Sequence, residues 1–309
     1  MIENIVMISQ QVLILFILIA IGFLCGRKGI INDKSSKSIT DIVLYTVTPC
    51  VMITAFQRDF TIDLLGKVFI AILCASLILA GSIIVSKLVF HDKDIGRRKV
   101  LGFATVFSNC GFMSLPLQKA ILGDDGWFYG SIFVAVFNVF VWTYGLVEMS
   151  GNRKLLSVKN LIFNPGVVGV LVALTLFICR IRLPYIVSEP MGYLANLNTP
   201  LPMLIIGFYL SKAYFKKAFS DKGTYLAMAV RLVVIPLIAT FAMLLFRVDS
   251  TMLVAFVIAS SAPTAATTTM FAAKHGRDTE LSVSIVASTT VVSIITMPLV
   301  VALASVFTG

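Results

Sequence analysis

The stretch Ser108-Asn109-Cys110-Gly111-Phe112-Met113-Ser114-Leu115-Pro116 interrupts a long apolar segment in the first half of the chain. A second stretch, Ser260-Ser261-Ala262-Pro263-Thr264-Ala265-Ala266-Thr267-Thr268-Thr269, interrupts an apolar segment in the second half. Each interrupted segment is the fourth of its half. In hydrocarbon, irregular backbone is tolerated only where it is buried in protein or lines a cavity. A matching pair of interruptions therefore predicts a solute-binding cavity near the middle of a membrane.

Composition places the chain among polytopic membrane proteins. Of its 309 residues, 58% are hydrophobic and 13% are charged, which is not the composition of a soluble domain. A membrane-spanning helix needs about 20 apolar residues. Ten segments meet this need: 5–26, 36–56, 64–90, 100–122, 127–149, 162–181, 189–211, 223–246, 250–273 and 279–306. We therefore expect an all-α protein that crosses the plasma (inner) membrane ten times.

The basic residues predict the orientation in the membrane. Of the 25 lysines and arginines, 18 lie in odd-numbered loops between segments and one lies inside a segment. The even-numbered loops hold the other six: Arg58, Lys67, Lys119, Arg180, Arg182 and Arg247. Positive charge collects on the cytoplasmic side, so we expect odd-numbered loops in the cytoplasm and both termini outside it. The net charge of +10 thus indicates topology in a lipid bilayer and not a nucleic-acid partner.

The chain divides at the polar link 150–154 into two halves, 1–150 and 151–309, with five segments each. An odd number of segments places the second half in the membrane in the opposite orientation, as in an inverted repeat. Proline positions agree with this correspondence. Pro49 lies in the second segment and Pro200 in the seventh, while the interruptions lie in the fourth and the ninth.

The run from Ser108 to Leu117 resembles the Asn-x-Gly-x-x-x-x-Pro signature of the auxin efflux carrier family. The run from Ser261 to Ala266 resembles the counterpart of that signature in the family's second half. The resemblance covers essentially the whole chain. The family includes plant PIN auxin exporters and bacterial permeases for malate or malonate. The plant proteins often carry a long loop between the halves, whereas the short link here is similar to the bacterial type.

This resemblance implies the sodium–proton-antiporter-like fold, in which segments four and nine cross at their interruptions. It also implies a scaffold of segments 1, 2, 6 and 7 and a moving transport domain of segments 3–5 and 8–10, which is the arrangement of an elevator-type carrier. A homodimer formed through the scaffold is a further expectation from the resemblance.

The interruptions contain most of the residues that we expect to bind a solute. Unwound backbone exposes the N-terminus of the half-helix that follows, and its partial positive charge favours an anion. The structural alternative is a pair of kinked packing helices. The candidate residues are Asn109, Cys110, Gly111, Ser114, Pro116, Pro263, Thr264 and Ala265. Three residues, Ser108, Asn109 and Thr264, could also coordinate sodium with backbone oxygens.

Two further candidates lie outside the interruptions. Arg231 is the only full charge well inside a segment, about 12 Å from the cytoplasmic end at 1.5 Å per residue. A cation at that depth needs a partner, water or the protein interior. Arg231 is either a counter-ion for an anionic substrate or an arginine that pairs with backbone carbonyls or snorkels to the surface. Asn138 could bond the first interruption or a neighbouring helix.

Absent motifs narrow the function. No Asp or Glu stands in the middle of a segment, which disfavours sodium–proton antiport. Neither a metal cluster, a P-loop nor a catalytic triad is visible, so we expect no enzyme and no cofactor. The sequence predicts a secondary transporter for a small organic anion, a carboxylate, with the coupling ion, proton or sodium, left open. The alternatives are a sodium-coupled organic-anion symporter resembling bile-acid carriers, and a receptor or channel of the same fold.

Overall fold

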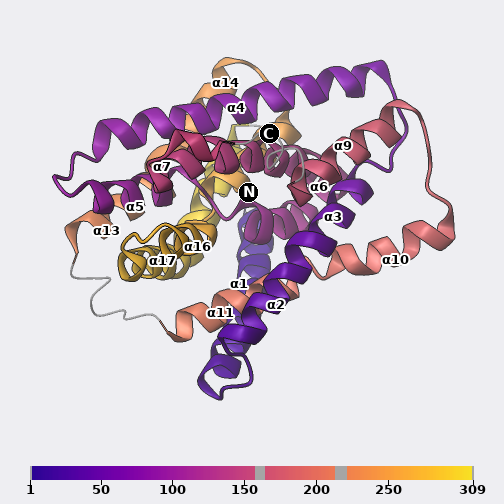
Figure 1. Cartoon of the computed structure of the whole chain (residues 1–309). Helices are drawn as coiled ribbons and strands as arrows, with labels where there is room; N and C mark the ends of the chain where they lie inside the picture. The colour runs from indigo at the N-terminus through magenta and orange to yellow at the C-terminus, as the bar shows by residue number, and fades with distance from the viewer. Residues whose placement is uncertain (1, 157–163, 213–220, 308–309) are drawn as a thin grey trace.

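The computed structural model describes residues 2–156, 164–212 and 221–307, which form a helical protein (Figure 1). The helices of the first half are α1 (Ile2–Arg27), α2 (Asp33–Ile42), α3 (Thr48–Ala55), α4 (Ile62–Val89), α5 (Ile95–Val106), α6 (Leu115–Phe140) and α7 (Leu146–Ser150). Three π-helical turns occur in this half. The turn η1 (Val43–Val47) joins α2 to α3, η2 (Cys110–Ser114) leads into α6, and η3 (Val141–Gly145) joins α6 to α7. A short 3-10 turn, η4 (Arg153–Leu155), follows.

The second half also contains long helices and interrupted ones. Its elements are α9 (Pro165–Ile178), α10 (Tyr185–Asn196), α11 (Pro200–Ser211), α13 (Lys222–Ala229), the π-helical turn η5 (Val230–Val234), α14 (Ile235–Leu245), α15 (Ser250–Ser261), α16 (Thr267–Lys274) and α17 (Thr279–Val306). The turn η5 joins α13 and α14 into one continuous helix.

Six stretches of the described helices are long and apolar enough to cross a membrane: Ser9–Arg27, Asp33–Ala55, Ile62–Val89, Cys110–Ser150, Lys222–Leu245 and Thr279–Val306. The apolar helices α9 and α15 are shorter. The expected all-helical, multi-pass membrane protein is thereby confirmed, while the count of ten crossings stays a prediction. Residues 162 and 163, the expected start of segment six, lie outside the described residues.

Two helices differ from the expected segments. The end of segment four and the start of segment five both fall within α6, where Gly123, with a φ of 63° and a ψ of −142°, turns the chain between them. That φ favours glycine because a Cβ would be strained there. Segment seven begins at Tyr185 and is divided into α10 and α11 around 197–199, where Pro200 starts α11 as proline commonly does.

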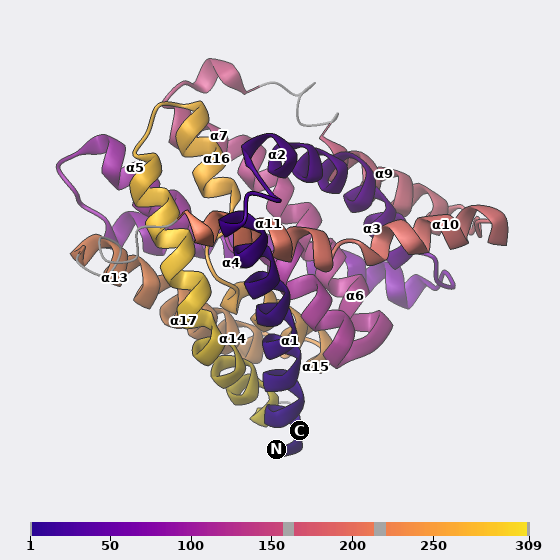
Figure 2. The ribbon, with the colours of Figure 1, turned by 90° about the horizontal axis from the view of Figure 1, so that it is seen from below.

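One group of helices is held together by glycine contacts. Figure 2 shows α1 crossing α11. A Cβ at Gly22 would lie 2.3 Å from the carbonyl oxygen of Leu204, and a Cβ at Gly207 would lie 2.0 Å from that of Ile19. Small residues allow such close crossings between membrane helices. Helix α3 packs on both α9 and α10.

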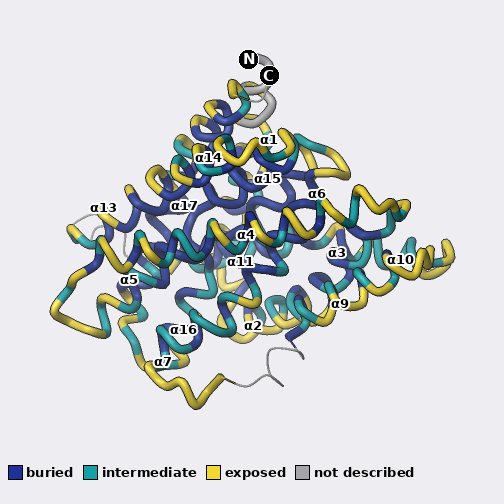
Figure 3. Tube along the Cα trace, turned by 90° about the horizontal axis from the view of Figure 1, so that it is seen from above, coloured by how far each residue is buried: buried dark blue, intermediate teal, exposed yellow. Residues whose placement is uncertain are grey.

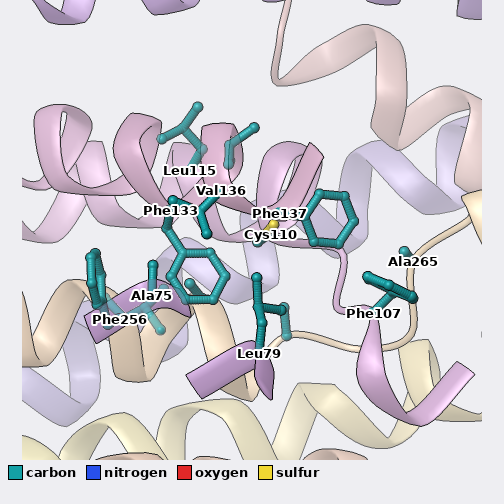
Figure 4. Packing of buried hydrophobic residues seen from close by; sticks show 14 of the residues in the cluster. Ala75, Leu79, Phe107, Cys110, Leu115, Phe133, Val136, Phe137, Phe256 and Ala265 are labelled. Carbon is teal, nitrogen blue, oxygen red and sulfur yellow. The ribbon is translucent and has the colours of Figure 1, made fainter. Parts of the chain in front are cut away.

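A second group surrounds α15. This helix packs on α6, α14 and α17, and all its residues from 252 to 261 are buried, as the dark blue centre of Figure 3 shows. Phe133 of α6 meets Phe256 of α15 edge to face, with ring centroids 5.2 Å apart (Figure 4). By contrast, large apolar side chains such as Leu73 and Ile295 are exposed on the outer helices, as expected where the solvent is lipid.

Candidate functional site

The two interruptions meet in the structure. After α5 and α15 the backbone is extended, and Ser108 and Thr264 form an isolated antiparallel bridge. The amide of Asn109 donates to the carbonyl of Pro263 at 2.7 Å, and the amide of Ala265 donates to the carbonyl of Phe107 at 2.9 Å. The broken backbones therefore satisfy each other inside the membrane protein, and Figure 4 shows Phe107 beside Ala265. The prediction that the interruptions of segments four and nine cross agrees with this pairing.

Side chains reinforce the crossing. The Thr264 hydroxyl donates to the carbonyl of Ala104 at 2.9 Å. The Ser114 hydroxyl donates to the carbonyl of Ile258 at 3.1 Å, and the Gln118 amide donates to the carbonyl of Ala255 at 2.6 Å. These bonds tie the half-helices of one interruption to those of the other. Thr264 and Ser114 therefore use their hydroxyl hydrogens on backbone in this conformation.

Arg231 lies on the side of the crossing where two helices end. Its side chain is buried, with 2% exposure. Nη1 donates to the carbonyls of Thr105 at 2.9 Å and Val106 at 3.0 Å, and Nη2 donates to the carbonyl of Ser260. These carbonyls belong to the last turns of α5 and α15, which carry partial negative charge and lack intrahelical donors. One guanidinium thus caps two helix C-termini, the arrangement that pairing with carbonyls predicts.

A cavity occupies another side of the crossing, where helices begin. It has about 900 Å³ of empty space, part of it open to solvent. Around the crossing it is lined by Ser108, Asn109, Gly111, Ala265, Ala266 and Thr267. The turn η2 begins at Cys110 and α16 begins at Thr267, and first-turn amides have no intrahelical acceptor. The positive helix ends therefore border the cavity, while Arg231 covers the negative ends.

Four asparagines line this cavity: Asn109, Asn138, Asn164 and Asn198. Asn198 Nδ2 donates to the carbonyl of Gly111 at 3.0 Å, and Asn138 Nδ2 donates to that of Val134 at 2.9 Å. Asn164 Oδ1 accepts from the amide of Gly166 at 3.0 Å and so caps α9. No charged side chain occurs among the described lining residues. The cavity thus offers neutral hydrogen-bonding groups among apolar and aromatic side chains.

The structure separates the candidate residues into two sets. Asn109, Gly111, Ala265 and Asn138 line the cavity. The others are buried behind its wall or around the crossing: Cys110, Ser114, Pro116, Pro263, Thr264 and Arg231. The suggested sodium ligands lie together at the bridge between Ser108 and Thr264. Among the described residues, no group of three His, Cys, Asp or Glu side chains could hold a metal ion.

Three polar lining residues were not among the candidates from the sequence: Asn164, Asn198 and Thr267. Asn164 and Asn198 enter the cavity from helices distant in the sequence, and Thr267 Oγ1 is buried without a hydrogen-bond partner beside them. The residue pairs Asn164-Pro165 and Thr199-Pro200 mark helix starts. These two N-terminal signals were the hint in the sequence that Asn164 and Asn198 lie close to helix starts.

The chain matches a family described as "Membrane transport protein" over residues 7–160 and 154–301. An uncharacterized transporter of Methanothermobacter thermautotrophicus is 21% identical over 294 residues, covering 94% of this chain and 96% of the relative. An uncharacterized transporter of Methanocaldococcus jannaschii is 24% identical over 302 residues, covering 93% of this chain and 96% of the relative. The expected resemblance to auxin efflux carriers is confirmed, and no enzymatic activity is indicated. The chain belongs to the membrane transport protein family.

Proposed function

We propose that the chain is a secondary transporter for a small organic anion, bound by its carboxylate at the crossing cavity. One observation carries this proposal. At the interruptions, the negative C-terminal helix ends and the positive N-terminal helix ends lie on different sides of the crossing. Arg231 is bonded to the negative ends, and the positive ends border a cavity that no described carboxylate lines.

The electrostatic argument can be given a magnitude. Each helix N-terminus is equivalent to about half an elementary positive charge, so two provide about one charge near the solute. Water and salt screen charges less in a narrow cavity than at a protein surface. A carboxylate would therefore be favoured over a neutral molecule of the same shape, and the asparagine amides would orient it.

The distribution of ion pairs supports two bodies, a scaffold of segments 1, 2, 6 and 7 and a transport domain of segments 3–5 and 8–10. Seven ion pairs occur among the described residues. Six lie within one proposed body when the loop 57–61 is counted with the scaffold, for example Lys212 with Asp33 in the scaffold and Arg97 with Asp221 in the transport domain. Two rigid bodies with few polar links between them can move as an elevator requires.

The remaining parts of the proposal follow from the same division. The two halves would be an inverted repeat of five crossings each, in the plasma membrane with both termini outside the cytoplasm, and the scaffold would form the homodimer. In that orientation Trp142 and Met270, which line the cavity, lie on the cytoplasmic side of the crossing. The structure would then correspond to an inward-facing state. The coupling ion would be a proton or sodium.

The test is binding of matched anionic and neutral ligands to purified protein. A panel of mono- and dicarboxylates and their amides is screened by thermal shift with and without sodium, followed by uptake in proteoliposomes. We expect at least one carboxylate to stabilise the protein while its amide does not, and that carboxylate to be transported. Equal stabilisation by acid and amide would overturn the anion proposal. Sodium-dependent stabilisation would favour a sodium symporter, and currents far above carrier turnover would indicate a channel.

A further inference from the structure

An arginine joins the two proposed bodies on the side away from the crossing cavity. Arg58 follows α3, and its Nη1 lies 2.9 Å from Asp125 Oδ1. Its guanidinium carbon lies 4.5 Å from the ring centroid of Phe128, a distance typical of a cation–π contact. Phe128 is fully buried and packs against Phe56 with centroids 4.9 Å apart. Since Phe56 belongs to segment two of the proposed scaffold, Arg58 and Phe56 both contact Phe128 of the other body.

A second cavity, of about 750 Å³ including open solvent, is lined by Arg58 of this contact but not by Asp125 or Phe128. It is lined by Thr54 and Arg58 at the end of α3, by Trp127 of α6 and by Ala195 of α10. The crossing cavity is lined by other residues of the same two helices, such as Thr48 of α3 and Asn138 of α6. The same pair of bodies thus encloses one cavity on each side, and Arg58 bridges the bodies in the second.

The Arg58–Asp125 pair is the one ion pair among the described residues that joins the two bodies. Its side chains are 22% and 62% exposed, so water can replace each partner and the contact can break and form again. A control pair lies on the same face. Arg182 Nη2 meets Asp59 Oδ1 at 2.7 Å, but Arg182 follows α9 and Asp59 lies in the loop 57–61, which we count with the scaffold.

We propose that Arg58, Asp125 and Phe128 form a latch that holds the second cavity closed to solute while the crossing cavity is open. Solute passage would require this latch to break as the transport domain moves. The inference rests on the proposed two-body transporter, since a latch is meaningful only if the bodies move. In this proposal Arg58 sets the balance between the state with the crossing cavity open and the state with the second cavity open, without contacting the solute.

The experiment measures solvent access on both sides, independently of any substrate. In a background in which the five native cysteines are replaced, Ala195→Cys reports on the second cavity and Met270→Cys on the crossing cavity. Labelling rates with a charged maleimide are compared for wild type, Arg58→Ala, Asp125→Asn and the control Arg182→Ala. Uptake of the stabilising carboxylate is measured in parallel.

We expect Arg58→Ala to raise labelling of Ala195→Cys about tenfold, since it removes both the ion pair and the cation–π contact. Asp125→Asn removes only the ion pair and should raise it about threefold. Labelling of Met270→Cys should fall in both variants, and Arg182→Ala should match wild type. Unchanged labelling in both latch variants, or an equal rise in Arg182→Ala, would overturn the latch. If labelling shifts as expected but no anion is transported, the latch stands and the proposed function fails.

Discussion

Replacing Arg231 with methionine should destabilise the protein without removing the preference for anions that we propose. The guanidinium makes three hydrogen bonds to the last-turn carbonyls of α5 and α15. Hydrogen bonds to charged groups contribute about 1.5–3 kcal/mol each. Two opposing effects reduce the sum: burying the cation is itself unfavourable, and its Nε has no hydrogen-bond partner. Leaving a buried carbonyl without its donor typically costs about 1–3 kcal/mol, so for three carbonyls, less the two opposing effects, we take about 3–5 kcal/mol as the expected loss.

The assay is thermal unfolding of the purified protein followed by intrinsic fluorescence. A loss of about 3–5 kcal/mol should lower the apparent Tm by roughly 6–15 °C. Arg231→Lys should recover part of this loss, because an ammonium group can still donate to these carbonyls but lacks the planar fork. Arg182→Met, which changes an exposed arginine, should lower the Tm much less.

Ligand binding at low temperature separates the two roles considered for Arg231. If the helix ends attract the anion, folded Arg231→Met protein still discriminates between a carboxylate and its amide. The reasoning would be refuted by a variant with wild-type Tm that no longer discriminates, because that result would place the guanidinium on the solute.

Three other changes test separate parts of the structure. Asn109→Ala should weaken carboxylate binding about tenfold, the effect of losing one hydrogen bond, with little change in Tm; an unaltered affinity would remove Asn109 from the site. Gly207→Val should abolish a monodisperse peak in size-exclusion chromatography, because its Cβ would lie 2.0 Å from a carbonyl oxygen of the facing helix. Burial alone would raise the pKa of Asp221, but hydrogen bonds from Thr224 and Arg97 outweigh it and lower the pKa. Asp221 then contributes stability above its unfolded pKa of about 3.9 and loses it as the pH falls through the lower folded value, so the Tm difference between wild type and Asp221→Asn should shrink between pH 7 and pH 3.

Local chemistry made much of the helix pattern predictable. The expected segment 223–246 corresponds to Lys222–Leu245, and 279–306 corresponds to Thr279–Val306. Long apolar runs set these lengths, and Asp221 and Asp278 cap the N-termini. The interruptions were visible for the same reason, because glycine, proline and clustered hydroxyls are conspicuous within apolar segments.

The partners of the polar side chains could not be predicted. Arg231 bonds to carbonyls of α5 and α15, and a backbone acceptor has no signature in the sequence. Asn198 reaches Gly111 from a position 87 residues away in the chain. The division of segment seven around 197–199 was also missed, since a proline near the middle of an apolar segment does not distinguish a kink from a break.

The separation of Arg231 from the cavity has a physical consequence for a carrier. A solute site must bind strongly enough to capture its ligand and weakly enough to release it. An uncompensated guanidinium inside a narrow cavity would hold a carboxylate through direct charge-assisted bonds. Here the full charge is used on the helix C-termini, and the solute would meet only partial charges from helix N-termini and neutral asparagine amides. Because Arg231 and its acceptors belong to the same proposed body, they would move together, and the crossing would keep its geometry as the solute passes from one side to the other.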